Sequence, residues 1–132
     1  MPETDFSYSD IQNFKYRLAE DLVVNLETIR PRLKVVLGQV QLSEDGTLKI
    51  SEGYLWNGSS GPTIDTESTM RASLVHDAIY SLMAAGALPS SYRHKADDIY
   101  LKLCLEDGMP RWRAKTHFYA LKFFGGNHAI PR

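Results

Sequence analysis

The chain has 132 residues, a length typical of one domain, and a hydrophobic share of 43%, enough for one buried core. Its formal net charge of −1 gives no basic excess, so no nucleic-acid partner is expected. The single cysteine, Cys104, excludes an intrachain disulfide and fits a reducing compartment. Met1–Asp10 is polar and is predicted to be a flexible tail rather than a signal peptide, and no run reaches the roughly 20 apolar residues of a membrane span.

Residues 14–56 have a mostly β pattern. Arg32–Leu42 and Leu48–Trp56 are predicted strands, and the Ser43–Gly46 turn between them has the Asp-Gly chemistry of a hairpin. Tyr16–Glu27 fits either a strand or a short helix, and its short, partly β-branched apolar run favours the strand.

Residues 57–65 form the predicted functional loop, because two glycines, a proline and small polar residues favour unusual backbone angles. The helices predicted after the loop run from about Thr66 to Ala85, from about Ser91 to Glu106, and from Pro110 to Gly125-Gly126. Strands followed by helices predict a single α+β domain over residues 1–132. An N-terminal antiparallel hairpin or small sheet precedes a three-helix half at 66–126.

His76 and Asp97 lie at the edges of the apolar arcs of the first and second predicted helices. If these helices pack side by side, the two side chains meet at the seam. A carboxylate that holds one ring nitrogen leaves the other as a general base. Asp98 is expected to face solvent, because neighbours on a helix differ by about 100°. A histidine or an aspartate at such an edge is more often structural than catalytic when taken singly, and that alternative stays open.

Three motifs follow one another along the chain: the Asn57–Pro62 loop, His76-Asp77-Ala78-Ile79-Tyr80, and Ala96-Asp97-Asp98-Ile99-Tyr100. This order resembles the phospholipase A₂ superfamily, above all its short prokaryotic members. From about Tyr16 to Gly125 the chain also resembles a phage and prophage domain family of unknown function. That family is marked by a Gly-aromatic-x-x-Asp-Gly-small-Ser-x-Pro loop, carried here by Gly53–Pro62, followed by His-Asp-x-x-Tyr.

The phospholipase resemblance implies a hydrolase that cleaves lipid esters with a His76–Asp97 dyad. In that family's pattern, His76 would be the base and Asp97 its orienting partner. Asp77 would bind calcium with oxygens from Asn57 and Gly58, and the Gly58 N–H would face the oxyanion. The supporting aromatic side chains would be Trp56, Tyr80 and Tyr100.

Two departures from the phospholipase pattern weaken this expectation. Position 57 is Asn where the prokaryotic phospholipases and most of the phage family have Asp, so calcium binding is predicted to be weak. The disulfides of the secreted phospholipases are absent. The alternative is a non-catalytic phage structural or interaction protein that keeps the fold. Expected partners are a phospholipid or membrane surface, or phage structural proteins, and the expected location is the infected host's cytoplasm or the virion.

Other polar candidates are weaker. A zinc site from His76, Asp77 and His94 is disfavoured, because His94 lies well away from Asp97 on the helical wheel. Cys104 lies in an apolar arc, where an inert packed thiol is expected.

The third predicted helix carries two sets of residues. The set assigned to the core is Trp112, Thr116, Tyr119, Ala120 and Phe123. The set assigned to a basic, solvated surface, with an anionic partner as the minority alternative, is Arg111, Arg113, Lys115 and Lys122.

Overall fold

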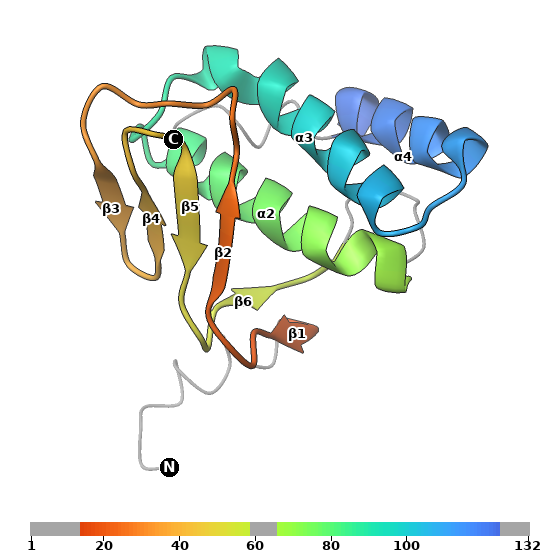
Figure 1. Ribbon diagram of the computed structural model, residues 1–132, viewed down its shortest axis with the longest axis horizontal. Coiled ribbons are helices and arrows are strands. Elements are labelled where there is room, and N and C mark those ends of the chain that lie inside the picture. The colour runs from red at the N-terminus through yellow and green to blue at the C-terminus, as the bar shows by residue number, and fades with distance from the viewer. Residues whose placement is uncertain (1–13, 59–65, 125–132) are drawn as a thin grey trace.

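A computed structural model describes residues 14–58 and 66–124 of the chain (Figure 1). The strands are β1 (Tyr16–Arg17), β2 (Leu22–Asn25), β3 (Val35–Leu37), β4 (Val40–Leu42), β5 (Thr47–Ile50) and β6 (Leu55–Trp56). The helical elements are α2 (Glu67–Ala84), the 3₁₀ turn η1 (Ser90–Tyr92), α3 (Arg93–Glu106) and α4 (Arg111–Phe124). Strands precede helices, so the predicted α+β fold is confirmed.

Some predicted segments lie outside the described residues. These are the tail Met1–Asp10, residues 59–65 of the predicted functional loop, and the Gly125-Gly126 stop. The described part of that loop is therefore Asn57 and Gly58.

The strands form an antiparallel sheet in the order β2-β5-β4-β3, and β1 pairs separately with β6. The turn Ser43–Gly46 is confirmed, with the Gly46 N–H donating to the Ser43 carbonyl at 2.9 Å. The prediction of one strand over Leu48–Trp56 is wrong, because this segment contains β5 and β6, which belong to different sheets. The prediction of one strand over Arg32–Leu42 is also wrong, because this segment contains both β3 and β4. Gly38, with φ of +56°, lets the chain reverse between them, a conformation that glycine adopts without steric cost.

The core lies between the four-stranded sheet and α2, which crosses one face of the sheet (Figure 1). Alternate residues of β4 and β5 are buried, as expected for strands with one face on a core. The fully buried side chains shared between the sheet and α2 include Leu42, Leu48, Ile50, Val75, Ile79 and Leu82. Among the described residues, no helix is both long enough and apolar enough to span a membrane.

Local signals set the helix ends. Thr66 caps α2 in a reciprocal capping box with Thr69, whose hydroxyl accepts the Thr66 N–H at 2.7 Å. Gly86 and Gly108, with φ of +80° and +97°, follow the ends of α2 and α3 and act as glycine stops. These ends place α2 and α3 side by side, with α4 packed on α3 (Figure 1).

The assignment of the α4 aromatic stripe to the core is wrong. Trp112, Tyr119 and Phe123 are 70%, 66% and 81% exposed. Instead, α4 buries Ala114 and His117. A terminal helix that packs on one neighbour buries one narrow face, and here that face is not the most apolar one.

Candidate functional site

His76 of α2 and Asp97 of α3 meet at the seam between their helices. The Nε2 atom of His76 lies 2.7 Å from Oδ1 of Asp97. Asp97 has no exposed surface, whereas Asp98 is exposed. The predicted contact and the predicted difference between the adjacent aspartates are therefore confirmed.

Aromatic side chains surround the His76 ring. The Tyr80 hydroxyl donates to the same Asp97 oxygen at 2.8 Å, and its ring centroid lies 4.1 Å from that of His76. The Tyr100 ring packs edge-on against the His76 ring, with 5.6 Å between the ring centroids. The Tyr100 hydroxyl forms a hydrogen bond with Nδ1 of His117 at 3.1 Å. The rings fix the orientation of His76 and keep bulk water away from Asp97.

Asp97 is held in its ionised form. Burial raises the pKa of this carboxyl, but the hydrogen bond and charge of His76, the Tyr80 hydroxyl and the Lys122 ammonium together lower it below the ordinary value of 3.8. An ionised carboxylate only accepts hydrogen bonds, so Nε2 of His76 is the donor. In the neutral ring, Nδ1 then carries the basic lone pair.

The two ring nitrogens of His76 differ in their hydrogen bonds, although the ring as a whole is nearly enclosed. The His76 side chain is 6% exposed. Across residues 14–58 and 66–124, the one enclosed side-chain nitrogen or oxygen without a hydrogen bond is Oδ2 of Asp97. No hydrogen-bond partner for Nδ1 of His76 is found among these residues, so that nitrogen is available to act as a base.

Lys122 of α4 is a part of the site that sequence reasoning missed. Its Nζ lies 3.7 Å from Oδ2 of Asp97 and 3.0 Å from Nδ1 of His94. The prediction that Lys122 belongs to a solvated surface is therefore wrong. The prediction that His94 lies well away from Asp97 is also wrong, because the Lys122 ammonium contacts both side chains, although His94 itself is exposed. A helical wheel drawn for α4 alone does not include Asp97 and His94 of α3, which the Lys122 side chain contacts.

Asp77, the predicted calcium ligand, lies beside the dyad on α2 and is held from the β-rich half. The Tyr54 hydroxyl donates to its Oδ2 at 2.6 Å and lies 3.3 Å from Oγ of Ser81. Burial, and then the charge and hydrogen bond of Asp77, raise the pKa of Tyr54 above its ordinary value of 10.0. Sequence reasoning missed Tyr54, although it stands in the quoted Gly-aromatic motif.

The described start of the loop is fixed by two polar contacts. The indole Nε1 of Trp56 donates to Oγ of Ser73 at 3.0 Å, which joins the loop to α2. The Oδ1 of Asn57 accepts the Lys15 N–H at 3.0 Å. Gly58 has φ of +84°, the unusual backbone angle expected there. The predicted role of its N–H stays untested.

The described residues include only part of the predicted calcium site. Among them, no three His, Cys, Asp or Glu residues lie close enough to hold a metal ion. Calcium takes six to eight oxygens and gains most from carboxylates. Asp77 is the one predicted ligand with a charge, and Tyr54 already hydrogen-bonds one of its oxygens. Calcium binding therefore stays a prediction.

Comparison with known proteins identifies one family. A family model described as "Protein of unknown function (DUF1353)" matches residues 39–121, well over half of the chain. The chain belongs to the DUF1353 family. No curated protein and no solved structure matches it. The DUF1353 match includes Tyr54, His76 and Asp97 of the site and ends one residue before Lys122.

Cys104 of this DUF1353 chain takes no part in the site. It is fully buried in α3, and burial raises the pKa of its thiol to about 11. A thiol that stays protonated is a poor nucleophile, so the predicted inert role agrees with its surroundings.

Proposed function

We propose that this chain is a phospholipase A₂-like hydrolase of phage origin, in which His76 and Asp97 activate water for attack on a lipid ester. The observation that carries the proposal is the 2.7 Å contact between Nε2 of His76 and a fully buried carboxylate. That contact assigns the proton to Nε2 and leaves Nδ1 available as a base.

In the proposed reaction, Nδ1 of His76 removes a proton from a water molecule whose oxygen adds to the ester carbonyl carbon. Asp97 stabilises the imidazolium that forms, as a buried carboxylate does for a catalytic histidine. Collapse of the tetrahedral intermediate breaks the bond to the alcohol oxygen, and the imidazolium returns its proton to that oxygen. The products are a carboxylic acid and an alcohol, so the proton balance closes.

Tyr80 and Lys122 have positioning roles in this proposal. Tyr80 shares Oδ1 of Asp97 with His76, and Lys122 faces Oδ2. Both contacts favour the carboxylate over the neutral acid. Retention of the carboxylate keeps the ring in the tautomer that the reaction needs.

The test is fatty-acid release from mixed phospholipid micelles, with and without added calcium. We expect hydrolysis by the wild type, a loss of about 10²–10⁴-fold in Asp97→Asn, and little change in Asp98→Asn. The two aspartates are adjacent on α3, and only Asp97 is buried, so Asp98→Asn is the matched control. Equal rates for both variants would remove the dyad mechanism.

The second candidate is a non-catalytic phage structural or interaction protein. The observation that favours it is the enclosure of Asp97, because a hydrogen-bonded His76–Asp97–Tyr80 cluster also stabilises a core without catalysing a reaction. Under this alternative, Asp97→Asn lowers the free energy of unfolding, and the wild type releases no fatty acid at any calcium concentration.

A further inference from the structure

The outward face of α4 carries a line of aromatic side chains, Trp112, Tyr119 and Phe123, here called the aromatic ridge. Their exposed fractions are 70%, 66% and 81%. On a helical wheel they fall within about 40° of one another, opposite the buried Ala114 and His117. The ridge therefore points directly away from the helix that α4 packs on.

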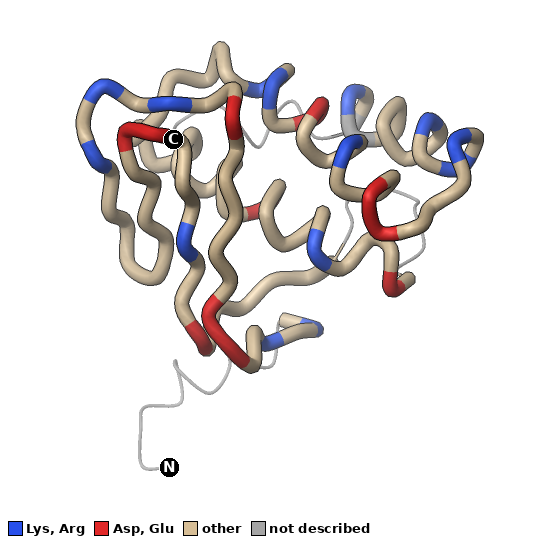
Figure 2. Tube along the Cα trace, in the orientation of Figure 1, with Lys and Arg blue, Asp and Glu red and all other residues tan. Residues whose placement is uncertain are grey.

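Positive charge flanks the ridge on both sides. Residues 111–124 contain four Lys or Arg and no Asp or Glu, and Figure 2 shows the basic positions along α4. Arg111 and Lys115 are exposed and lie on one side, about 60–100° from the ridge. Arg113 lies on the other side, with its guanidinium 5.9 Å from the centroid of the Trp112 ring. The Lys122 ammonium faces Asp97 and is therefore not one of the charges that flank the ridge.

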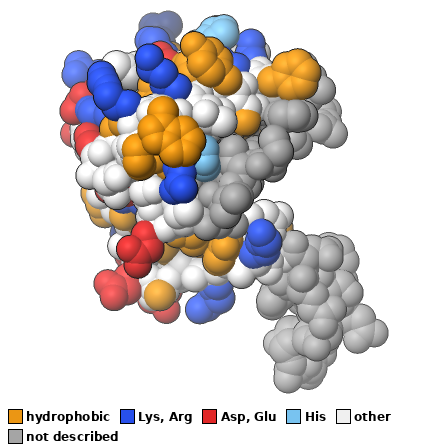
Figure 3. Space-filling view, turned by 90° about the vertical axis from the view of Figure 1, so that its right-hand side faces the viewer, with side chains coloured by type: hydrophobic (Ala, Val, Ile, Leu, Met, Phe, Trp, Pro, Cys, Tyr) orange, Lys and Arg blue, Asp and Glu red, His pale blue; other side chains and the backbone are white. Residues whose placement is uncertain are grey.

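We propose that the aromatic ridge and its basic flanks bind an anionic lipid surface. Aromatic side chains insert at the boundary between headgroups and acyl chains, while Lys and Arg attract anionic headgroups. Figure 3 shows hydrophobic and basic side chains side by side over the upper part of the molecule, at the height of α3 and α4 in Figure 1. The choice of a lipid partner rests on the proposed function.

A second copy of the chain is a poorer occupant of this face. Two-fold pairing through α4 would place a helix with four Lys or Arg residues against an identical basic helix. The helix has no acidic residue to compensate for that repulsion. An anionic surface removes the repulsion, so charge complementarity favours an anionic lipid surface over a second copy of the chain.

Vesicle binding is measured with the His76→Gln variant, so that the lipid is not consumed. Vesicles of phosphatidylcholine with phosphatidylglycerol are compared with vesicles of phosphatidylcholine alone, by co-sedimentation and tryptophan emission. The chain has two tryptophans, and Trp56 is 5% exposed. A blue shift on binding therefore reports on Trp112. We expect binding and a blue shift with the anionic vesicles.

Variants locate the binding face. Trp112→Ala with Tyr119→Ala is expected to weaken binding at least about tenfold, because both rings lose their insertion area. The matched control is Leu33→Ala with Val36→Ala, which removes apolar side chains that are 75% and 60% exposed on the sheet side. The control is expected to bind like its parent.

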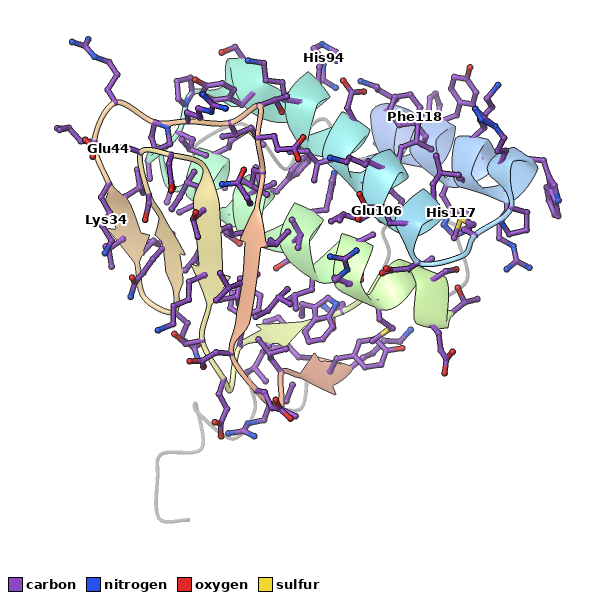
Figure 4. The ribbon with its side chains drawn as sticks, viewed as in Figure 1. Lys34, Glu44, His94, Glu106, His117 and Phe118 are labelled. Carbon is purple, nitrogen blue, oxygen red and sulfur yellow. The ribbon has the colours of Figure 1, made fainter. Side chains whose placement is uncertain are left out.

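Charge variants test the basic flanks. Arg111→Gln and Lys115→Gln each remove one positive charge. Each substitution is expected to weaken vesicle binding about fivefold and to reduce its salt dependence. Lys34→Gln is the control, because Lys34 is exposed on β-sheet connections far from Phe118 of α4 (Figure 4).

Failure of this proposal is distinct from failure of the proposed function. Absence of binding to anionic vesicles, or equal binding by the ridge variant and its control, would overturn the proposal that the ridge binds a lipid surface. Self-association that Trp112→Ala abolishes, without vesicle binding, would also overturn it. Hydrolysis of a soluble short-chain ester by the wild type reports on the dyad alone and does not depend on the ridge.

Discussion

Nε2 of His76 lies 2.7 Å from Oδ1 of Asp97, although the two residues are 21 positions apart along the chain. The contact joins α2 to α3 and sets the tautomer of the ring, since Asp97 is ionised and accepts the proton of Nε2.

The first prediction concerns that tautomer. In the neutral ring, ¹⁵N NMR should place the proton on Nε2 of His76 and leave Nδ1 bare. In Asp97→Asn the amide loses the negative charge that selects this form, so the preference should weaken or invert. A proton found on Nδ1 in the wild type would contradict the geometry-based assignment.

The second prediction concerns Lys122 and stability in acid. Lys122→Met should reduce the free energy of unfolding at neutral pH by about 1 kcal/mol, because Asp97 loses a nearby positive charge. The pKa of Asp97 is lowered in the folded state, so its contribution is present above the ordinary value of 3.8 and is lost as the pH falls through the folded-state pKa. Denaturant unfolding of both proteins against pH should show the difference shrinking in acid. Lys115→Met, at an exposed position of the same helix, is the control and should show no such difference.

The third prediction tests the link from the β-rich half to α2. Tyr54→Phe removes the hydroxyl that donates to Asp77 and should cost about 0.5–1.5 kcal/mol of unfolding free energy. Because the pKa of Tyr54 is raised, its contribution is present below the ordinary value of 10.0 and is lost as the pH rises further. Tyr92→Phe, at another half-buried tyrosine, is the matched control and should change stability little. Equal losses in the two variants would mean that the Tyr54–Asp77 contact contributes nothing.

Local patterns predicted much of this fold, because they depend on neighbouring residues. The Ser43–Gly46 turn and the Gly86 stop follow from local backbone chemistry, and the His76–Asp97 contact follows from two helical wheels with one assumption of side-by-side packing. Gly38 was overlooked as a turn because the apolar run continues on both sides of it.

The errors at α4 have a tertiary origin. Which face a helix buries depends on how many neighbours it has, and that number is not contained in its own sequence. The exposed ridge at Trp112 and the inward turn of Lys122 both follow from the packing of α4 on α3. The Tyr54 contact with Asp77 was missed for a similar reason, because it joins a loop next to β6 with the middle of α2.

The fourth prediction concerns calcium. We expect wild-type binding in the high micromolar to millimolar range, and tighter binding in Asn57→Asp, because a second carboxylate adds attraction that the amide oxygen lacks. Isothermal titration of both forms measures this, with Asp77→Asn as the variant that should abolish binding. If neither form binds at millimolar calcium, position 57 is not part of a cation site.

The most direct measurement of the proposed function is hydrolysis of mixed phospholipid micelles across a calcium titration by the wild type and His76→Gln, with the released fatty acid identified. The wild type should release fatty acid, and His76→Gln should be slower by at least about 10²-fold while retaining the wild-type circular dichroism spectrum. Equal release by the two proteins, or none from the wild type at any calcium concentration, would contradict the account and favour the non-catalytic alternative.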